Sequence, residues 1–321
     1  MILIKIFYSI AVNLRNFFYD KKILPSYKSS IPVISIGNIT VGGTGKTPFV
    51  IFLATYLKDR GDNPLIISRG YKRQGTKQIL LTTGHSYSVK EMGDEPSLMR
   101  QLCNNVDILI DANRVAAVKW AEKQNKKYNY IILDDAFQHR AISRDFNILL
   151  INPQQNMGSY PPQGKLREPF KNIKRADCVV LTKGKQDNAL TSLIESYNLP
   201  ILETAIDFTI SDNDQKRGVS FCGIADSNFF IQTLSHFSIK TRDHLNFKDH
   251  QEYNDLIIEK IERILIKNKE RTFFTTRKDW VKLPKYFLKK YRGICIDMFL
   301  SIKKGTNQSK FEELLLKHIN K

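Results

Sequence analysis

Short runs of apolar residues alternate with amphipathic stretches over the N-terminal part of the chain. The apolar runs have the length of buried strands and lie at 31–36, 64–68, 106–110, 130–133, 147–151 and 178–182. Helical patterns separate them, among them 46–60, which ends before Gly61, and 114–124. Strands that alternate with helices are typical of a parallel sheet with helices on both faces. The pattern therefore predicts an α/β fold with a mostly parallel sheet.

A smaller α/β lobe is predicted where the pattern restarts after about residue 202. Its signals are apolar runs at 219–224 and 273–276 and a helical stretch at 226–236. The closing segment 308–320 places its apolar residues on one face of a helix. We therefore expect a helical segment at 1–28, a large domain at 29–205, and a smaller lobe with a closing helix at 206–321.

The opening segment 2–19 is mostly apolar, but its polar residues recur at helical spacing. They form one narrow stripe of Lys5, Ser9, Asn13, Asn16 and Asp20. These interruptions make a poor membrane-spanning helix, and no cleavage site for a signal peptide follows. Five basic residues and one acid within 1–30 leave a balance of +4. We expect a helix lying in the interface of an anionic membrane; the alternative is a helix packed on the protein's own core.

The net charge favours an anionic partner. The chain has 50 Lys and Arg against 32 Asp and Glu, a formal charge of +18, although scattered lysines alone also describe a solvated surface. No RNA- or DNA-binding signature accompanies the lysines, so we expect no nucleic-acid partner. The cysteines lie far apart without paired spacing, at Cys103, Cys178, Cys222 and Cys295. We expect them to be reduced and buried, as in a protein on the cytoplasmic side of a membrane.

A glycine-rich loop follows the first predicted strand and precedes a predicted helix. The phosphate-binding pattern G-x-x-x-x-G-K-[ST] is matched at its end by Gly45, Lys46 and Thr47, whereas its first position holds Thr40. Lys46 is expected to reach the β- and γ-phosphates, and the Thr47 hydroxyl to bind Mg²⁺. The alternative is a glycine-rich turn without a nucleotide. The expected ATP-binding residues are Thr40, Val41, Gly42, Gly43, Thr44, Gly45, Lys46 and Thr47.

A second metal position is expected at the end of an apolar strand. Asp134 and Asp135 directly follow the run 130–133, and such an aspartate holds Mg²⁺ in many phosphate-binding-loop proteins. Lys185 stands where a GTPase would have the base-reading aspartate, and Val41 stands where a partitioning ATPase would have lysine. Both observations point away from those classes and leave a phosphotransferase.

Several segments together resemble one family, the tetraacyldisaccharide 4′-kinases of lipid A synthesis. The matching segments are SIGNITVGGTGKTP (35–48), SRGY (68–71), MGDEP (92–96), DDAFQHRAISRD (134–145), PPQGKLREP (161–169), FCGI (221–224), KDHQEY (248–253) and TTRKDWVKL (275–283). Two departures stand out. Ala136 follows Asp135 where the family usually has glycine, and Arg277 stands where glutamate is usual.

The resemblance implies a kinase of the phosphate-binding-loop type that moves the γ-phosphate of ATP to the 4′-hydroxyl of an acylated glucosamine disaccharide 1-phosphate. ATP and Mg²⁺ are the expected cofactors. The N-terminal helix would hold the enzyme, expected as a monomer, at the cytoplasmic face of the inner membrane. The alternatives are a soluble kinase or ATPase with another small substrate, and a metallochaperone or scaffold. A metallochaperone or scaffold would need a His/Cys metal cluster, and the scattered cysteines of the sequence do not form one.

The expected catalytic residues are Asp94, His250 and Lys46. Asp94 is a candidate base for the acceptor hydroxyl, although its place before Glu-Pro also fits a helix N-cap. By resemblance, His250 orients Asp94 or shares its proton. The expected metal ligands are Thr47, Asp134, Glu95 and Asp135. Candidates for phosphate or substrate contacts are Arg69, Gln138, His139 and Arg167.

Overall fold

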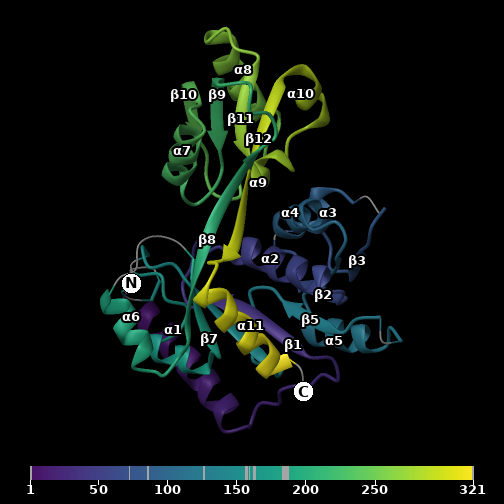
Figure 1. Ribbon diagram of the computed structural model, residues 1–321, viewed down its shortest axis with the longest axis vertical. Helices are drawn as coiled ribbons and strands as arrows, with labels where there is room; N and C mark the ends of the chain where they lie inside the picture. The colour runs from purple at the N-terminus through teal and green to yellow at the C-terminus, as the bar shows by residue number, and fades with distance from the viewer. Residues whose placement is uncertain are drawn as a thin grey trace.

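One twelve-stranded sheet runs through the whole chain in the order β10-β9-β11-β12-β8-β7-β6-β1-β5-β2-β4-β3. The computed structural model describes residues 2–71, 73–84, 87–125, 127–155, 158, 160–161, 164–182 and 188–319, with side chains from residue 6 onward. Lys5 of the polar stripe, residues 162–163 of the PPQGKLREP motif and Lys185 therefore lie outside the part of the chain considered at side-chain level. Figure 1 shows a large lobe below and a smaller lobe above.

The large lobe holds the parallel part of the sheet. Neighbouring strands from β4 to β8 are parallel, and the short edge strand β3 is antiparallel to β4. The strands are β1 (Val33–Asn38), β2 (Pro64–Ser68), β3 (Ile79–Leu81), β4 (Asp107–Ile110), β5 (Tyr130–Leu133), β6 (Phe146–Ile151), β7 (Cys178–Leu181) and β8 (Ile201–Ile210). The helices are α1 (Ile2–Asp20), α2 (Lys46–Asp59), α3 (Val89–Met92), α4 (Asp94–Leu102), α5 (Arg114–Glu122), the 3₁₀ helix η1 (Phe170–Arg175) and α6 (Asn188–Glu195). The predicted α/β fold and all six predicted strands of this region are confirmed.

The smaller lobe continues the same sheet. Its strands β9, β11 and β12 are parallel to one another, and β10 is parallel to β9. The elements are β9 (Arg217–Cys222), α7 (Ser227–His236), β10 (Lys240–Asn246), α8 (Asp255–Lys267), β11 (Thr272–Thr276), α9 (Arg277–Trp280), α10 (Lys285–Lys290), β12 (Arg292–Ile302) and α11 (Thr306–Ile319). The long strands β8 and β12 pair antiparallel and connect the two lobes (Figure 1).

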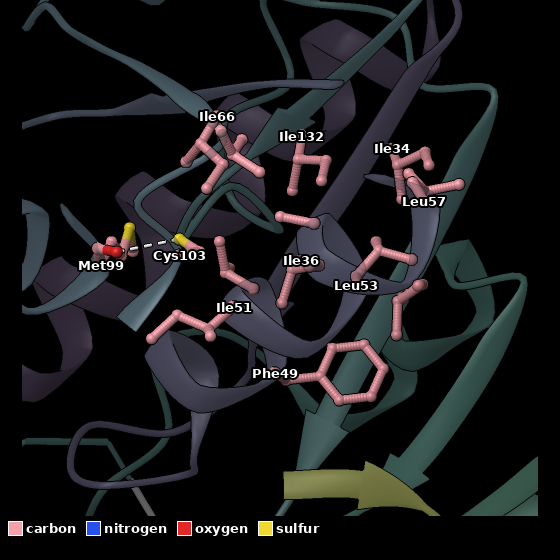
Figure 2. Close-up of a cluster of buried hydrophobic side chains, with 14 of the residues drawn as sticks. Ile34, Ile36, Phe49, Ile51, Leu53, Leu57, Ile66, Met99, Cys103 and Ile132 are labelled. Carbon is pink, nitrogen blue, oxygen red and sulfur yellow. Dashed lines mark hydrogen bonds between the residues drawn. The ribbon is translucent and has the colours of Figure 1, made fainter. Parts of the chain in front are cut away.

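The main core lies between α2 and the central strands. Ile34, Ile36, Ile66 and Ile132 from the strands meet Phe49, Leu53 and Leu57 from α2 (Figure 2). Burying each such side chain stabilises the fold by about 1.5–3 kcal/mol. Helix α11 belongs to this same core through Phe311, Leu314, Leu315 and Ile319. The closing helix thus packs on the large lobe, not on the smaller lobe where its position in the sequence had placed it.

Helix α1 contacts the large lobe through a narrow side that includes Val12 and Asn16, while Asn13, Asp20 and much of its apolar surface are exposed. Asn16 is 5% exposed, whereas Phe7 is 69% exposed and Ile10 is 56% exposed. The Tyr8 hydroxyl donates to the Arg167 carbonyl at 2.8 Å. The alternative raised by the sequence, a helix packed on the protein's own core, is therefore met only in part: among the described side chains of α1, Val12 is the buried apolar one. Among the described residues, no helix has both the length and the hydropathy needed to cross a membrane.

The four cysteines are free and buried. Burial raises the pKa of the Cys103 and Cys222 thiols to about 12. The prediction of reduced, buried cysteines is confirmed by their lack of pairing.

Candidate functional site

The site gathers at the carboxyl edge of three adjacent parallel strands. In the sheet β1, β5 and β2 are neighbours, and the carboxyl ends of parallel strands meet at one edge. The glycine-rich loop follows β1, Asp134 and Asp135 follow β5, and Arg69 follows β2. Segments that are far apart in the sequence are brought together here by the sheet itself.

The loop has the backbone shape of a phosphate cradle. Gly42 and Gly45 have φ values of 116° and 78°, which other residues rarely adopt. Gly45 is the N-cap residue of α2, so the helix begins at Lys46 with its free N–H groups facing the loop. The Asn38 side-chain amide donates to the Thr44 hydroxyl at 2.8 Å, and the Thr182 hydroxyl donates to the Thr44 carbonyl at 2.9 Å. These contacts hold the loop in place.

The two lobes enclose a cavity of about 810 Å³. Every predicted site residue lines it except Thr40. Thr40 is buried, and its hydroxyl donates to Gln155 at 2.8 Å, so its side chain supports the loop from behind. Residues that sequence analysis did not assign also line the cavity. They include Arg15, Tyr71, Arg114 and a group of apolar side chains from β8 and the smaller lobe: Phe208, Ile224, Phe229, Phe230, Ile296 and Met298.

Asp135 is surrounded by cations. Arg167 donates from one nitrogen to both carboxylate oxygens, at 2.8 and 2.9 Å, and the Lys46 ammonium lies 3.6 Å from Oδ1. Burial alone would raise the pKa of Asp135, but Lys46 and Arg167 outweigh it and hold the pKa below its usual range. Asp135 also has a φ of 47°, a conformation that costs energy for a residue other than glycine. Asp135 therefore holds Lys46 and Arg167 close together, where both cations can face phosphate oxygens.

Asp134 has the environment of a metal ligand. It is 2% exposed, and the Ser68 hydroxyl donates to its Oδ2 at 3.0 Å. Its Oδ1 is buried and has no hydrogen-bond partner among the described residues. Burial, with Glu95 and Asp135 adding to it, raises the pKa of Asp134 to about 7. An unpaired carboxylate oxygen near a phosphate cradle is a suitable ligand for Mg²⁺. Within the described ranges no three or more His, Cys, Asp or Glu side chains are grouped to hold a metal, so these carboxylates do not form a complete metal site by themselves.

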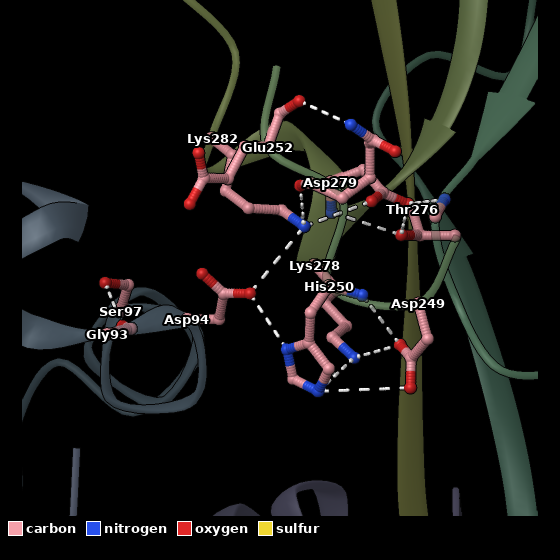
Figure 3. A network of polar contacts seen from close by, with 12 residues as sticks. Gly93, Asp94, Ser97, Asp249, His250, Glu252, Thr276, Lys278, Asp279 and Lys282 are labelled. Carbon is pink, nitrogen blue, oxygen red and sulfur yellow. Dashed lines mark hydrogen bonds and ion pairs between the residues drawn. The ribbon is translucent and has the colours of Figure 1, made fainter. Parts of the chain in front are cut away.

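Asp94 meets His250 across the lobes. The His250 Nδ1–H donates to Asp94 Oδ2 at 2.9 Å (Figure 3). Gly93 is the N-cap of α4 and Asp94 is its first residue, without a side-chain cap bond, so an N-cap role for Asp94 is wrong. Burial alone would raise the pKa of Asp94, but the hydrogen bond from His250 and the charges of Lys282 and Lys278 outweigh it and lower the pKa.

Gln138 and His139, two further predicted contacts, differ in their surroundings. Gln138 donates to the Asn38 carbonyl at 2.8 Å and to the buried Glu168 at 2.9 Å, so both hydrogens of its amide nitrogen are engaged and its amide oxygen is the atom left for a ligand. Burial lowers the pKa of His139 to about 4, and neighbouring arginines add to this shift. Those arginines are Arg114, Arg144, Arg15 and Arg69. His139 thus stands neutral among cations.

Arg15 and Arg114 were missed for different reasons. Arg114 begins α5 just after β4, and its guanidinium donates to the carbonyls of Asp134 and Asp135. The rule that strand ends share an edge could have found it. Arg15 was counted as an interruption of the apolar helix and as one of the five basic residues within 1–30, and nothing in the pattern shows that it lines the cavity.

Arg277, the second departure from the family pattern, lies at the rim of the same cavity. Its guanidinium donates to both oxygens of Asp297 at 2.6 and 2.7 Å. The pair joins α9 to β12, so the arginine has a structural partner of its own.

Known proteins resemble this chain over nearly its whole length. The family described as tetraacyldisaccharide-1-P 4′-kinase matches residues 1–320. A tetraacyldisaccharide 4′-kinase of Aquifex aeolicus is 34% identical over 289 residues, which cover 87% of this chain and 88% of the relative. One of Pelodictyon phaeoclathratiforme is 33% identical over 301 residues, which cover 86% and 84%. The crystal structure of the "apo" form of LpxK from Aquifex aeolicus in complex with ATP has a TM-score of 0.79 and 30% identity, covering 99% of this chain and 98% of that one. The chain therefore belongs to the tetraacyldisaccharide-1-P 4′-kinase family.

Proposed function

We propose that this protein is an ATP-dependent kinase of lipid A biosynthesis. It transfers the γ-phosphate of ATP to the 4′-hydroxyl of tetraacyldisaccharide 1-phosphate, an acylated glucosamine disaccharide. The observation that carries the proposal is one cavity that holds both a phosphate cradle at Lys46 and a carboxylate–imidazole pair at Asp94 and His250. A nucleotide-binding protein without a transfer reaction has no need of the second feature.

The phosphate side binds and neutralises the donor. The N–H groups of the loop and of the first turn of α2 face the phosphates, and Lys46 contacts the β- and γ-phosphates. Thr47, Asp134 and Glu95 are the proposed ligands of Mg²⁺, and Asp135 is a further one. When bound, the ion neutralises phosphate charge. Arg167 lies on the same side, beside Lys46 and Asp135, so we assign it to the phosphates of ATP.

The base side activates the acceptor. Asp94 accepts the proton of the 4′-hydroxyl while the oxygen of that hydroxyl forms a bond to the γ-phosphorus. The bond from that phosphorus to the bridging oxygen breaks, and ADP leaves. His250 orients Asp94 or shares this proton. Arg69 and Arg15 lie on the cavity wall with no salt bridge in the part of the chain that the structure describes. Together with His139 and Gln138 they are the proposed contacts of the acceptor, whose 1-phosphate suits guanidinium groups.

The decisive experiment is a transfer assay. Purified protein is incubated with γ-labelled ATP, Mg²⁺ and the disaccharide acceptor in detergent, and the lipid fraction is scored for label. Label in the lipid supports the proposal. ATP turnover without labelled lipid would support a kinase or ATPase with a different substrate.

We further propose that α1 holds the enzyme, as a monomer, at the cytoplasmic face of the inner membrane. Its outward side carries exposed apolar residues, with Phe7 at 69%, Ile10 at 56% and Leu14 at 50% exposure. An acylated acceptor resides in a bilayer, and an interfacial helix brings the cavity to it. The cavity receives Arg15 from this same helix.

Membrane binding is tested with a pair of charge substitutions. Phe7→Asp with Leu14→Asp should weaken binding to anionic phospholipid vesicles by about tenfold or more, because each apolar side chain contributes on insertion. The matched control is Leu256→Asp with Ile266→Asp on α8, where the wild-type residues are 74% and 68% exposed. Equal losses from both pairs would contradict a specific role of α1. Light scattering of detergent-free protein at one chain mass supports the monomer, and a dimer mass contradicts it.

A further inference from the structure

A buried lysine contacts the proposed catalytic base from the smaller lobe. The Lys282 ammonium lies 3.8 Å from Asp94 Oδ2, the oxygen that also accepts the hydrogen bond from His250 (Figure 3). The Lys282 side chain is 6% exposed. Two groups from one lobe therefore converge on a single oxygen of a carboxylate from the other lobe.

Lys282 is itself held in place by the smaller lobe. Its ammonium donates to the Gln251 carbonyl at 3.0 Å and lies 3.4 Å from Asp279 Oδ1. A buried cation is confined to such partners because leaving them costs several kcal/mol. The position of Lys282 Nζ is thereby fixed relative to His250.

Asp279 provides the anchor. It is fully buried, and its Oδ2 accepts from the Gly223 N–H at 3.0 Å and from the Thr276 hydroxyl at 2.7 Å. A Cβ at residue 223 would lie 3.1 Å from the Asp279 carboxylate and 2.9 Å from Gln251 Cβ, so the glycine allows this close approach. Three segments distant in the sequence, FCGI, KDHQEY and TTRKDWVKL, meet at this one network.

The consequence lies in the freedom of the Asp94 carboxylate. The terminal torsion of an aspartate is broad, so one hydrogen bond leaves the carboxylate free to rotate. A second contact on the same oxygen from another direction restricts that rotation. Asp94 Oδ1 then remains as the oxygen without a hydrogen-bond or salt-bridge partner in the described part of the chain, and Asp94 lines the cavity.

We infer that Lys282 is a positioning residue: with His250 it fixes Oδ2 of Asp94, so that Oδ1 is the oxygen presented to the acceptor hydroxyl. This inference rests on the proposed kinase function, in which Asp94 takes the proton of that hydroxyl. Lys282 is not among the residues that line the cavity, so it acts through Asp94. A lysine that served merely as the ion-pair partner of Asp279 would affect folding without affecting turnover separately.

The test compares Lys282→Met with Lys282→Arg in the transfer assay. Lys282→Met should lower kcat by about 10- to 100-fold, the usual loss for a residue that orients a functional group. KM for ATP should stay within about twofold because the nucleotide side is intact. Lys282→Arg keeps a cation beside Asp94 and should recover most of the loss. The control is Lys290→Met, which removes an exposed lysine of the same lobe that pairs with Glu262; it should leave the rate unchanged.

Coupling to Asp94 separates positioning from a general structural effect. In an Asp94→Asn background, Lys282→Met should cause no further loss of kcat, because residues that act as a unit are not additive. If Lys282→Met lowered kcat by the same factor in the Asp94→Asn background as in the wild type, the inference would be overturned. A normal kcat in the single variant Lys282→Met would overturn it as well. If Lys282→Met abolishes the thermal unfolding transition, the double variant Lys282→Met/Asp279→Asn removes the buried carboxylate with its cation. That variant should show the same loss of kcat, and full turnover would overturn the inference.

The outcomes distinguish this inference from the function on which it rests. Absence of labelled lipid with the wild-type protein would refute the proposed function. Labelled lipid from the wild type together with unaffected Lys282 variants would refute the positioning role alone.

Discussion

The phosphate side and the base side of the cavity are both rich in charge, but they are assembled differently. On the phosphate side, Lys46, Asp134 and Asp135 follow neighbouring strands of one lobe, and Arg167 joins them from the same lobe. On the base side, Asp94 from the large lobe meets His250 and Lys282 from the smaller one. The donor site therefore needs one lobe, whereas the base is complete only where both lobes meet.

This difference separates two kinds of defect. Damage on the phosphate side should weaken nucleotide binding and transfer together. Damage on the base side should slow transfer while nucleotide binding persists. Substitutions on each side can test whether nucleotide binding and transfer are affected independently, as expected if the phosphate side needs one lobe and the base side needs both.

The largest effect is expected from Asp94→Ala. Loss of the general base should lower kcat by about 100- to 10,000-fold. ATP affinity, measured by calorimetry, should stay near the wild-type value because the phosphate cradle lies on other elements. Glu259→Ala on the exposed side of α8 serves as the control. Near-normal turnover by Asp94→Ala would show that the base has been misassigned.

Lys46→Ala should have the next largest effect. Removing a cation aimed at developing phosphate charge should lower kcat/KM by about 100- to 1,000-fold. Unlike Asp94→Ala, this variant should also bind ATP more weakly, which steady-state kinetics and calorimetry measure together. A rate equal to that of the wild type would remove the loop from the mechanism. Weak binding in Asp94→Ala as well would break the contrast between the two sides.

Arg277→Glu restores the residue usual in the family and tests a contact specific to this chain. Arg277 donates to both oxygens of Asp297, whose side chain is 11% exposed. The substitution leaves that carboxylate without a cation and adds a like charge, so unfolding free energy should fall by about 3 kcal/mol. Urea denaturation measures the change.

The control for Arg277→Glu is Arg292→Glu, which breaks an exposed ion pair with Asp212 in the same lobe. That loss should stay below about 1 kcal/mol. Equal losses would mean that burial does not set the strength of the Arg277 pair. An unchanged stability of Arg277→Glu would mean that Asp297 finds another partner.

The sequence predicted the phosphate side better than the base side for a physical reason. Asp134 and Asp135 directly follow a buried strand, Lys46 ends the glycine-rich loop that follows another, and parallel strands bring their carboxyl ends together. The pattern of strands therefore predicts their proximity. Arg114 obeys the same rule but was not recognised.

The base side carries no such local signal. Asp94 and Lys282 are joined only by the way β8 and β12 place the smaller lobe over the large one, and those two strands were not predicted. Polar and apolar residues mix along β8 because much of it is only half-buried where it crosses between the lobes. Likewise the apolar face of α11 shows that the helix is buried, but not on which lobe. The pairing of Asp94 with His250 was predicted from resemblance alone.

The smallest effect is expected at His139, and its sign follows from the direction of its pKa. Burial and neighbouring arginines lower the pKa of His139 in the folded protein to about 4, whereas the unfolded chain keeps the ordinary value near 6.5. Stability from the neutral imidazole is therefore present above pH 6.5 or so and is lost as pH falls toward 4. His139→Gln cannot be protonated, so it should lose less stability between pH 7 and pH 4.5, by about 1 kcal/mol after solvent screening.

Urea denaturation at the two pH values measures this difference, and His236→Gln, at an exposed position on α7, provides the control. The result bears on the contrast between the sides because His139 lies beside arginines from α1, α5 and the segments that follow β2 and β5. A neutral imidazole there adds no further positive charge to this group of arginines. An identical acid loss in His139→Gln and the wild type would show that the pKa of His139 is not lowered in the folded protein.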